Sequence, residues 1–396
     1  MTGTDEPLYG TPQPPHVPLG PLSPPLHRAS TAAQPDAATL REFGAGRRAG
    51  EFYQRVGHPN ARAFESLVAR REGADGAVSF GSGMAAMSAA ILALVQAGDR
   101  VLVADEIYGG TDALARSDLP RFGVRVERFA ALGAFDRAAL AQALIGGARM
   151  VVFESPINPT LRLVDIAAVS AVCRAHGALS VFDGTFAPPP IQRALAHGVD
   201  LVVHSATKFY GGHSDLVAGV VAGRHELLRP LEAFRRRTGG ILAPDPAWLL
   251  CRSAATMDLR VRSQQAAAGE LAARLRELVA RGELLGVSWP GFADHPDAAV
   301  RSRQMDGGGC LVAFECKGGL DGARAVFDGL RLVARAASLG GVETLASLPA
   351  FTTHASLSDD QRRRAGIPDG LLRISVGLEG ADAIFADIAQ AVRRAR

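Results

Sequence analysis

The stretch DLVVHSATKFYGGHSD, residues 200–215, decides the fold. It begins with an apolar, β-branched run, which is typical of a strand that is buried on both faces of a sheet. Lys208 follows this run after the short segment HSAT. Because lysine is rarely buried without a partner, it is either an edge residue whose amine reaches solvent or a nucleophilic amine whose pKa burial lowers. Ser205 and Thr207 favour the second interpretation, since two hydroxyls beside such an amine suit a phosphate anchor.

Strands of the same kind recur upstream of this stretch. Between about residues 60 and 225, short β-branched runs alternate with alanine-rich helical stretches. This alternation predicts a mostly parallel sheet with helices on both faces, so the expected fold class is α/β. The expected strands are GAVSF, DRVLVAD, VRVERF, RMVVFES, ALSVFD and DLVVHS.

Composition divides the chain into four expected parts. Residues 1–50 form an extended arm, because the proline-rich start fixes φ and removes backbone donors. This arm is either a tail or a segment that reaches over a neighbouring subunit. Residues 51–245 form a large ligand-binding domain, and a long helical pattern over residues 246–284 connects it to a small α+β domain at residues 285–396.

Charge, hydropathy and cysteine spacing exclude several classes of protein. The net charge is only +3, and the cluster Arg235–Arg237 is too short for a nucleic-acid footprint, so we interpret it as a solvated helix face or an anion contact. No apolar run reaches the ~18 residues of a membrane span, and the start has no signal core. We therefore expect a cytoplasmic protein without nucleic-acid or membrane partners. The four cysteines have no CxxC spacing, so neither a metal site nor a disulfide framework is expected.

The carboxyl ends of the expected strands carry the candidate site residues, because ligands of open α/β sheets bind there. The strand GAVSF runs into the turn Gly81–Met84, whose backbone N–H groups can face an anion at a helix start. Glycines in such turns also serve purely steric needs. Asp183 ends the strand ALSVFD, either as a turn or N-cap residue or as the acid that keeps a pyridine nitrogen protonated. Tyr108 follows one further strand, and Glu154 and Asn158 come from the end of the strand RMVVFES.

Several longer segments match a known family. They include FGSGMAAMSAAI, LVADEIYGGT, VFESPINP, VFDGTFAPP, HSATKFYGGHSD and LLRISVGLE. From about residue 50 onward the chain resembles the pyridoxal-5′-phosphate (PLP) enzymes of Cys/Met metabolism, which are fold-type I. The members it resembles are cystathionine γ-synthase, cystathionine γ-lyase, cystathionine β-lyase, methionine γ-lyase and O-acetylhomoserine sulfhydrylase. The resemblance implies that residues 51–245 bind PLP.

This resemblance implies a role for each candidate residue. Lys208 would hold PLP as a Schiff base and move protons, and Tyr108 would stack on its ring and act in acid–base catalysis. Asp183 would pair with the pyridine nitrogen, and Asn158 would contact the ring hydroxyl oxygen. Gly83 and Met84 would bind the phosphate through backbone N–H groups, and Ser205 and Thr207 through hydroxyls. The residues of the same chain that are expected to bind the cofactor are Ser82, Gly83, Met84, Tyr108, Asn158, Asp183, Thr185, Ser205, Thr207 and Lys208.

Substrate and partner residues are implied in the same way. Arg373 would clamp the substrate α-carboxylate through its planar guanidinium, with Ser338 beside it. Tyr53 and Arg55 match a pair that reaches the phosphate of a partner subunit, so a homotetramer built as a dimer of dimers is expected. The family's Asp-Asn-Thr becomes Asp183-Gly184-Thr185 here.

Two further departures bear on the substrate. Members that process cystathionine often carry an acid where this chain has Ala337, and methionine γ-lyases carry a cysteine where it has Gly110. The expected reaction is γ-elimination or γ-replacement on a Cγ-substituted L-amino acid, including a neutral substrate other than cystathionine or a halide leaving group. The alternatives are β-elimination, as in cystathionine β-lyase, and a non-catalytic PLP-binding protein. The presence of Tyr108 and Arg373 argues against the last.

Overall fold

A seven-stranded sheet forms the larger part of the molecule. In the computed structural model, which describes residues 23–395 except 49, 133–135, 353 and 356–357, its strand order is β1-β7-β6-β5-β4-β2-β3. Strand β7 runs antiparallel to both neighbours, and the other pairs are parallel, which confirms the expected mostly parallel α/β sheet. The strands are β1 (Gly76–Phe80), β2 (Arg100–Ala104), β3 (Arg125–Phe129), β4 (Met150–Glu154), β5 (Leu179–Asp183), β6 (Leu201–His204) and β7 (Gly219–Gly223).

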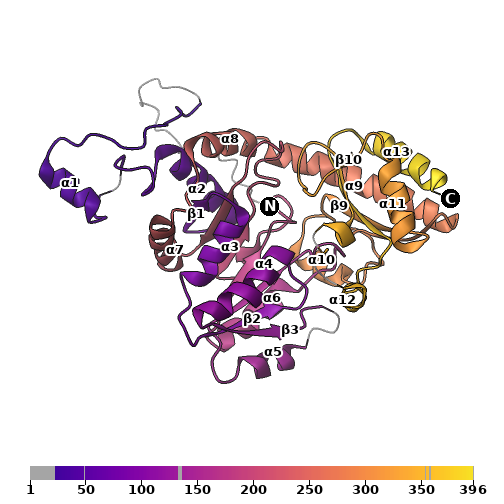
Figure 1. Cartoon of the computed structure of the whole chain (residues 1–396), viewed down its shortest axis with the longest axis horizontal. Coiled ribbons are helices and arrows are strands. Elements are labelled where there is room, and N and C mark those ends of the chain that lie inside the picture. The colour runs from indigo at the N-terminus through magenta and orange to yellow at the C-terminus, as the bar shows by residue number, and fades with distance from the viewer. Residues whose placement is uncertain (1–22, 49, 133–135, 353, 356–357, 396) are drawn as a thin grey trace.

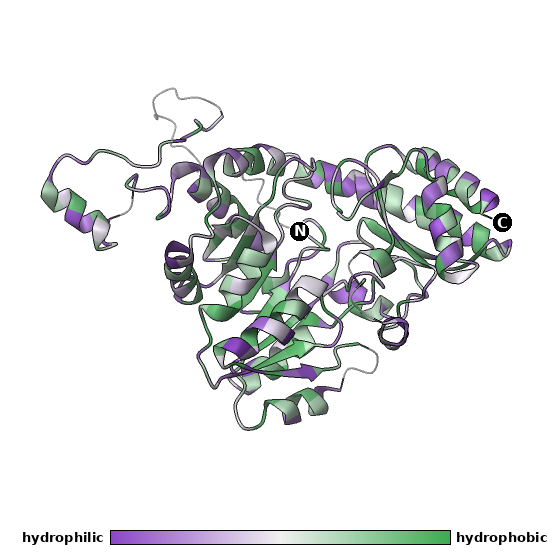
Figure 2. Cartoon of the chain, viewed as in Figure 1, coloured by the Kyte–Doolittle hydropathy of each residue, from purple (hydrophilic) through white to green (hydrophobic). Residues whose placement is uncertain are grey.

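Apolar cores cover both faces of this sheet. Successive residues of β5 point to opposite faces, so Phe182 joins one buried cluster and Val181 another. Each is almost fully excluded from solvent. The helices that accompany this sheet are α2 (Pro59–Glu72), α3 (Gly83–Leu92), α4 (Gly109–Ala113), α5 (Arg137–Leu144), α6 (Ile166–Ala175), α7 (His225–Thr238) and α8 (Pro244–Ala254). Figure 1 shows them packed around the strands, and Figure 2 shows the apolar strands between them.

A five-stranded sheet with order β10-β11-β12-β9-β8 forms the second part. Its strands are β8 (Leu284–Ser288), β9 (Leu311–Cys316), β10 (Ala334–Arg335), β11 (Leu345–Ser347) and β12 (Leu371–Ser375). Helices α9, α11 and α13 bury an apolar cluster against it, in which Leu275, Phe314 and Leu372 are each at most 1% exposed. The helices of this part are α9 (Met257–Ala280), α10 (Ala298–Gln304), α11 (Gly319–Gly329), α12 (Asp359–Arg364) and α13 (Ala381–Arg394).

The helical pattern between the two sheets forms two helices rather than one. Helix α8 ends at Ala254, and α9 begins at Met257. The Ser253 carbonyl accepts hydrogen bonds from the Thr256 hydroxyl and from Arg260, so side chains compete with the helical backbone at this break. Helix α9 then runs to the five-stranded sheet (Figure 1).

The described N-terminal segment first contacts α2 and α8, where Asn60 donates to the carbonyl of Pro25 and Arg28 pairs with Asp245, and then extends away from both sheets. Helix α1 (Ala37–Gly44) lies at the far left of Figure 1, and Leu40 on it is 49% exposed. The proline-rich residues 1–22 lie outside the described part of the chain. Within the described residues, no helix is long and apolar enough to span a bilayer.

We predict that Asp387→Asn lowers the free energy of unfolding by roughly 1–3 kcal/mol at neutral pH, because it weakens a buried hydrogen-bond network. The Asp387 carboxylate on α13 accepts backbone N–H bonds of 2.8–2.9 Å from Arg331, Leu332 and Val333. Burial alone would raise the pKa of this acid, but these bonds outweigh it and hold the pKa below its usual value. The stabilisation is therefore present above the unfolded-state pKa of about 3.9 and is lost as the pH falls. Urea denaturation at pH 7 and at about pH 2.5, below the unfolded-state pKa, measures the difference, and an equal loss at both would contradict a role for the charge.

Candidate active site

A cavity of about 280 Å³ lies at the carboxyl ends of β4, β5 and β6, where the seven-stranded sheet meets β12. It brings together every expected site residue except Tyr53 and Arg55. Those that line it are Ser82, Gly83, Met84, Tyr108, Asn158, Asp183, Thr185, Ser205, Thr207, Lys208, Ser338 and Arg373. Sequence analysis assigned no site role to several other lining residues, including Met87, Glu154, Phe186, Val217 and Leu339. Glu154 had a detectable signal, because it ends an expected strand.

The ε-amine of Lys208 is enclosed by the cavity. Its Nζ donates a hydrogen bond of 2.9 Å to Oγ of Ser338, which belongs to the loop between β10 and β11. Burial, followed by the positive charge of Arg373, lowers the pKa of Lys208 to about 8. About a tenth of the amine is therefore unprotonated at pH 7, far more than for an ordinary lysine, and the unprotonated form is the nucleophile for a carbonyl group.

The guanidinium of Arg373 lines the same cavity as the amine of Lys208. It is 3% exposed and extends from β12, donating 2.7 Å to Oδ1 of Asn158 and 3.0 Å to the carbonyl of Ser338. Its buried Nε has no hydrogen-bond partner among the described residues. Burial lowers the pKa of Arg373 to about 10. This cation is therefore desolvated, and its Nε–H is among the donors left for an anionic ligand.

Two acids lie side by side on the floor of the cavity. Glu154 and Asp183 are register partners at the ends of β4 and β5. Burial raises the pKa of both, and the charge of Asp183 helps to raise the pKa of Glu154 to about 8. A positive charge placed beside Asp183 would favour its ionised form, which is what a protonated pyridine nitrogen supplies.

The glycine turn before α3 leaves room for a close ligand approach. A Cβ on Gly83 would lie 2.7 Å from Cβ of Ser205, so only glycine fits. Ser82 caps α3 by accepting 3.0 Å from the N–H of Ala85, so its hydroxyl oxygen is used by the helix as an acceptor while its O–H group can still donate. The Thr207 hydroxyl lines the cavity but also exchanges hydrogen bonds with the backbone of Ala218. The start of α3 therefore offers backbone N–H groups to an anion.

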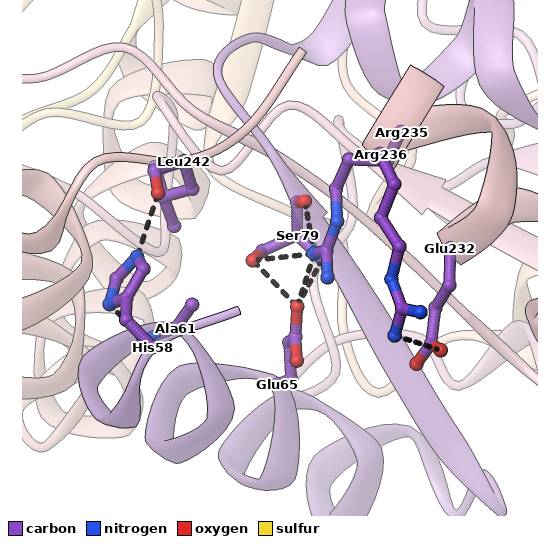
Figure 3. A network of polar contacts seen from close by, with 8 residues as sticks. All are labelled: His58, Ala61, Glu65, Ser79, Glu232, Arg235, Arg236 and Leu242. Atoms are coloured by element: carbon purple, nitrogen blue, oxygen red, sulfur yellow. Dashed lines mark hydrogen bonds and ion pairs between the residues drawn. The ribbon is translucent and has the colours of Figure 1, made fainter. Parts of the chain in front are cut away.

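A buried ion pair supports β1 ahead of this turn (Figure 3). Arg235 on α7 donates 2.6 Å to Oε1 of Glu65 and 2.8 Å to the carbonyl of Ser79. The same oxygen of Glu65 accepts from the N–H and hydroxyl of Ser79. Arg235 is only 4% exposed, so the expected solvated helix face is wrong for this residue, and its anion contact is with the carboxylate of Glu65. Its partners are 156 and 170 residues away in the chain.

Close contacts explain the glycines at two positions where the chain departs from the family pattern. A Cβ on Gly110 would lie 2.6 Å from the Tyr108 ring and 2.9 Å from Sδ of Met84. A Cβ on Gly184 would lie 2.8 Å from Cε1 of His204. Neither glycine has a positive φ. A larger residue at either position would therefore displace neighbouring side chains, so packing rather than backbone conformation favours glycine there.

Tyr53 and Arg55 lie outside the cavity of their own chain. Nη1 of Arg55 donates 2.6 Å to the carbonyl of Arg236, and its guanidinium lies 5.3 Å from the centre of the Tyr53 ring. Tyr53 is 42% exposed. The structure therefore does not bring this pair to the site that Lys208 and Asp183 share, and its assignment to a partner's site stays a prediction.

We predict that an amine-directed acylating reagent modifies Lys208 of the ligand-free protein along a pH profile with a midpoint near 8, because the cavity disfavours the protonated amine. Lys208 and the exposed Lys317 are the two lysines of the chain, so Lys317 is a matched internal control. Mass spectrometry of the two peptides measures both profiles. A Lys208 midpoint at the ordinary lysine value of about 10.4 would contradict the prediction.

Comparison with known proteins agrees with this geometry. The model of the family described as Cys/Met metabolism PLP-dependent enzyme matches residues 11–393. L-methionine gamma-lyase of Pseudomonas putida is 38% identical over 377 residues, which cover 94% of this chain and 93% of that protein. Cystathionine beta-lyase of Bacillus subtilis is 37% identical over 376 residues, or 94% and 92%. The solved structure of cystathionine gamma synthase from Xanthomonas oryzae in complex with cystathionine has a TM-score of 0.87 and 35% identity, covering 94% and 93%. The chain belongs to the family of Cys/Met metabolism PLP-dependent enzymes.

Proposed function

We propose that this enzyme catalyses γ-elimination or γ-replacement on a Cγ-substituted L-amino acid. The observation that carries the proposal is the buried guanidinium of Arg373, whose unpartnered Nε shares one cavity with the amine of Lys208. Guanidinium groups bind carboxylates through paired N–H bonds. An α-carboxylate bound to Arg373 would hold the α-carbon of the substrate within the cavity that Lys208 lines.

The residues of the cavity fit PLP. Because a Cβ at Gly83 would meet Ser205, the bare backbone there suits a phosphate group, and Asp183 suits the pyridine nitrogen. PLP, when bound, supplies an electron sink that makes the α-proton of the substrate acidic. We propose that the amine of Lys208 is the group that would bind the aldehyde of PLP as a Schiff base.

The chain's own residues would then move the protons. With a pKa of about 8, Nζ of Lys208 is suited to accept and return protons near neutral pH. The Oγ of Ser338, 2.9 Å away, orients this amine. Tyr108 lines the same cavity and is 39% exposed, so its hydroxyl group can serve as a further acid or base at the mouth of the site.

The far end of the cavity suits an uncharged substituent. Ala337 is exposed at the cavity, next to Ser338, and Val217 and Leu339 also line it. The acids among the described lining residues are Glu154 and Asp183, both at strand ends. A distal ammonium, as in cystathionine, would find no acid at position 337, and an unpaired desolvated charge is costly. We therefore propose a neutral substituent, such as a thioether, an acyl ester or a halide.

β-Elimination is the alternative reaction. The relatives include both a methionine gamma-lyase and a cystathionine beta-lyase at nearly equal identity, 38% and 37%. Identity alone therefore does not choose between Cγ and Cβ chemistry. The 2-oxo acid product distinguishes the two eliminations, because γ-elimination leaves a four-carbon 2-oxo acid and β-elimination leaves pyruvate.

We also propose a homotetramer, built as a dimer of dimers, in which each site takes Tyr53 and Arg55 from a partner. Three observations support this assembly: both residues lie outside their own cavity, Tyr53 is 42% exposed, and helix α1 projects away from the sheets (Figure 1). We propose the cytoplasm as the location, because all four cysteines are buried thiols, which suits a reducing compartment.

We predict that the wild-type enzyme has a higher kcat/KM for a neutral Cγ-substituted amino acid than for cystathionine, and that Ala337→Glu reverses the order by at least about tenfold. The introduced carboxylate would pair with the distal ammonium of cystathionine. For neutral substrates it offers no such pairing and narrows the pocket that holds their γ-substituent. Mass spectrometry of the 2-oxo acid gives the rate and regiochemistry of elimination, and mass spectrometry of the new amino acid formed with an added thiol gives the rate of γ-replacement. If wild-type enzyme turns over cystathionine best, the proposed pocket is wrong, and pyruvate as the main product would establish β-elimination.

We predict that co-assembly of Lys208→Ala chains with Arg55→Ala chains restores activity that neither variant has alone. If a site combines Lys208 of one chain with Arg55 of another, each mixed dimer contains one intact site of two, so the purified mixed dimer has about half of wild-type activity. Co-expression with two different tags and purification of the mixed species measures it. Inactive mixed dimers that remain folded would show that each site is built within one chain.

A further inference from the structure

Glu154 is a buried acid for which the proposed reaction has no role. It ends β4, is 5% exposed and lines the cavity beside its register partner Asp183. Two buried carboxyls side by side are unfavourable unless other groups compensate them, because burial and mutual repulsion both oppose ionisation. The compensation comes from two backbone N–H groups.

Each oxygen of Glu154 serves a different loop. Oε2 accepts 2.7 Å from the N–H of Tyr108, which follows β2, and Oε1 accepts 3.1 Å from the N–H of Asn158, which follows β4. The Asn158 side chain in turn accepts 2.7 Å from Nη1 of Arg373. A continuous hydrogen-bonded path therefore runs from the aromatic residue to the guanidinium, with Glu154 at its centre.

We propose that Glu154 is a positioning residue that sets, through one carboxyl oxygen each, the loop that carries Tyr108 and the loop that carries Asn158. A single buried side chain thus fixes the aromatic ring relative to the residue that orients Arg373. This inference deepens the proposed function at the same site and rests on PLP binding there, but not on the identity of the amino-acid substrate.

A carboxyl group is chemically suited to this task. Among side chains of this size, only a carboxyl group offers an accepting oxygen to each of two N–H groups in either protonation state, since even the hydroxyl oxygen of its neutral form keeps a lone pair, whereas the isosteric glutamine has one acceptor and an NH₂ donor. Glu154→Gln must therefore leave either Tyr108 or Asn158 facing a donor. Glu154→Asp keeps both acceptor oxygens, but its side chain is one methylene shorter and places them farther from the two N–H groups. The two variants consequently separate loss of an acceptor from loss of reach.

The experiment uses the full-length protein with and without PLP and a matched control. Asp387→Asn is the control, because Asp387 is also a buried carboxylate that accepts backbone N–H bonds, but it lies on α13 and does not line the cavity. Three quantities are measured: hydrogen exchange of the Tyr108 and Asn158 amides, the dissociation constant for PLP, and the visible circular dichroism of bound PLP.

For Glu154→Gln we expect exchange at one of the two amides to accelerate at least about tenfold and the PLP dissociation constant to rise about tenfold, as for one lost buried hydrogen bond. The visible dichroism should weaken, because the ring is held less firmly. Asp387→Asn should leave all three quantities within about twofold of wild type while lowering stability.

Wild-type exchange and PLP affinity in Glu154→Gln would overturn the proposal, and so would equal changes in Asp387→Asn. If Glu154→Gln does not fold, the same assays on Glu154→Asp decide: a PLP dissociation constant raised more than about twofold supports the proposal, and wild-type values overturn it. Because no substrate is used, failure of the substrate predictions leaves this test intact. A wild-type chain that binds no PLP would instead contradict the proposed function.

Discussion

The parallel register of β4, β5 and β6 determines where the polar groups of the cavity lie. Glu154 opposes Asp183, and Asp183 opposes Val203, two residues before Ser205. Parallel strands end at a common edge, so acids and hydroxyls that are far apart in the chain meet there without a dedicated loop. The five-stranded sheet completes the site from the other side, because Arg373 on β12 reaches Asn158.

Burial shifts the charged groups of this cavity toward their neutral forms. The pKa of Lys208 falls to about 8 and that of Arg373 to about 10, whereas the pKa values of Glu154 and Asp183 rise. A ligand that brings a carboxylate to Arg373 and a cation to Asp183 reverses these shifts, because each charge gains a partner. The desolvated site therefore favours a zwitterionic or multiply charged ligand over a neutral one.

Local sequence was sufficient for the features that depend on neighbouring residues. The α/β class and the family were predicted correctly, and the strand ends located the acid, amine and glycine turn that the cavity brings together. Strand β7 was missed, because its short apolar run has no helix before it and pairs antiparallel with distant partners. Arg235 was misinterpreted for a similar reason, since its partner Glu65 lies 170 residues away.

The remaining part of the site depends on contacts that no local pattern specifies. Ser338 and Arg373 come from the five-stranded sheet, so only the family resemblance indicated them. The hydrogen bonds of Glu154 escaped prediction because both donors are backbone N–H groups, which every residue except proline carries. The domain boundaries and the roles of Tyr53 and Arg55 stay predictions.

The scarcity of lysine has a practical and chemical consequence. Lys208 lies inside the cavity, and the only other lysine, Lys317, is exposed between β9 and α11. Almost all other positive charge is carried by arginine, whose guanidinium does not condense with aldehydes at neutral pH as an amine does. Apart from the N-terminal amine, stray aldehydes and activated esters therefore have one accessible side-chain target on the surface. Coupling through amines would attach the protein to a support at Lys317 or at the N-terminal amine, rather than at many surface lysines.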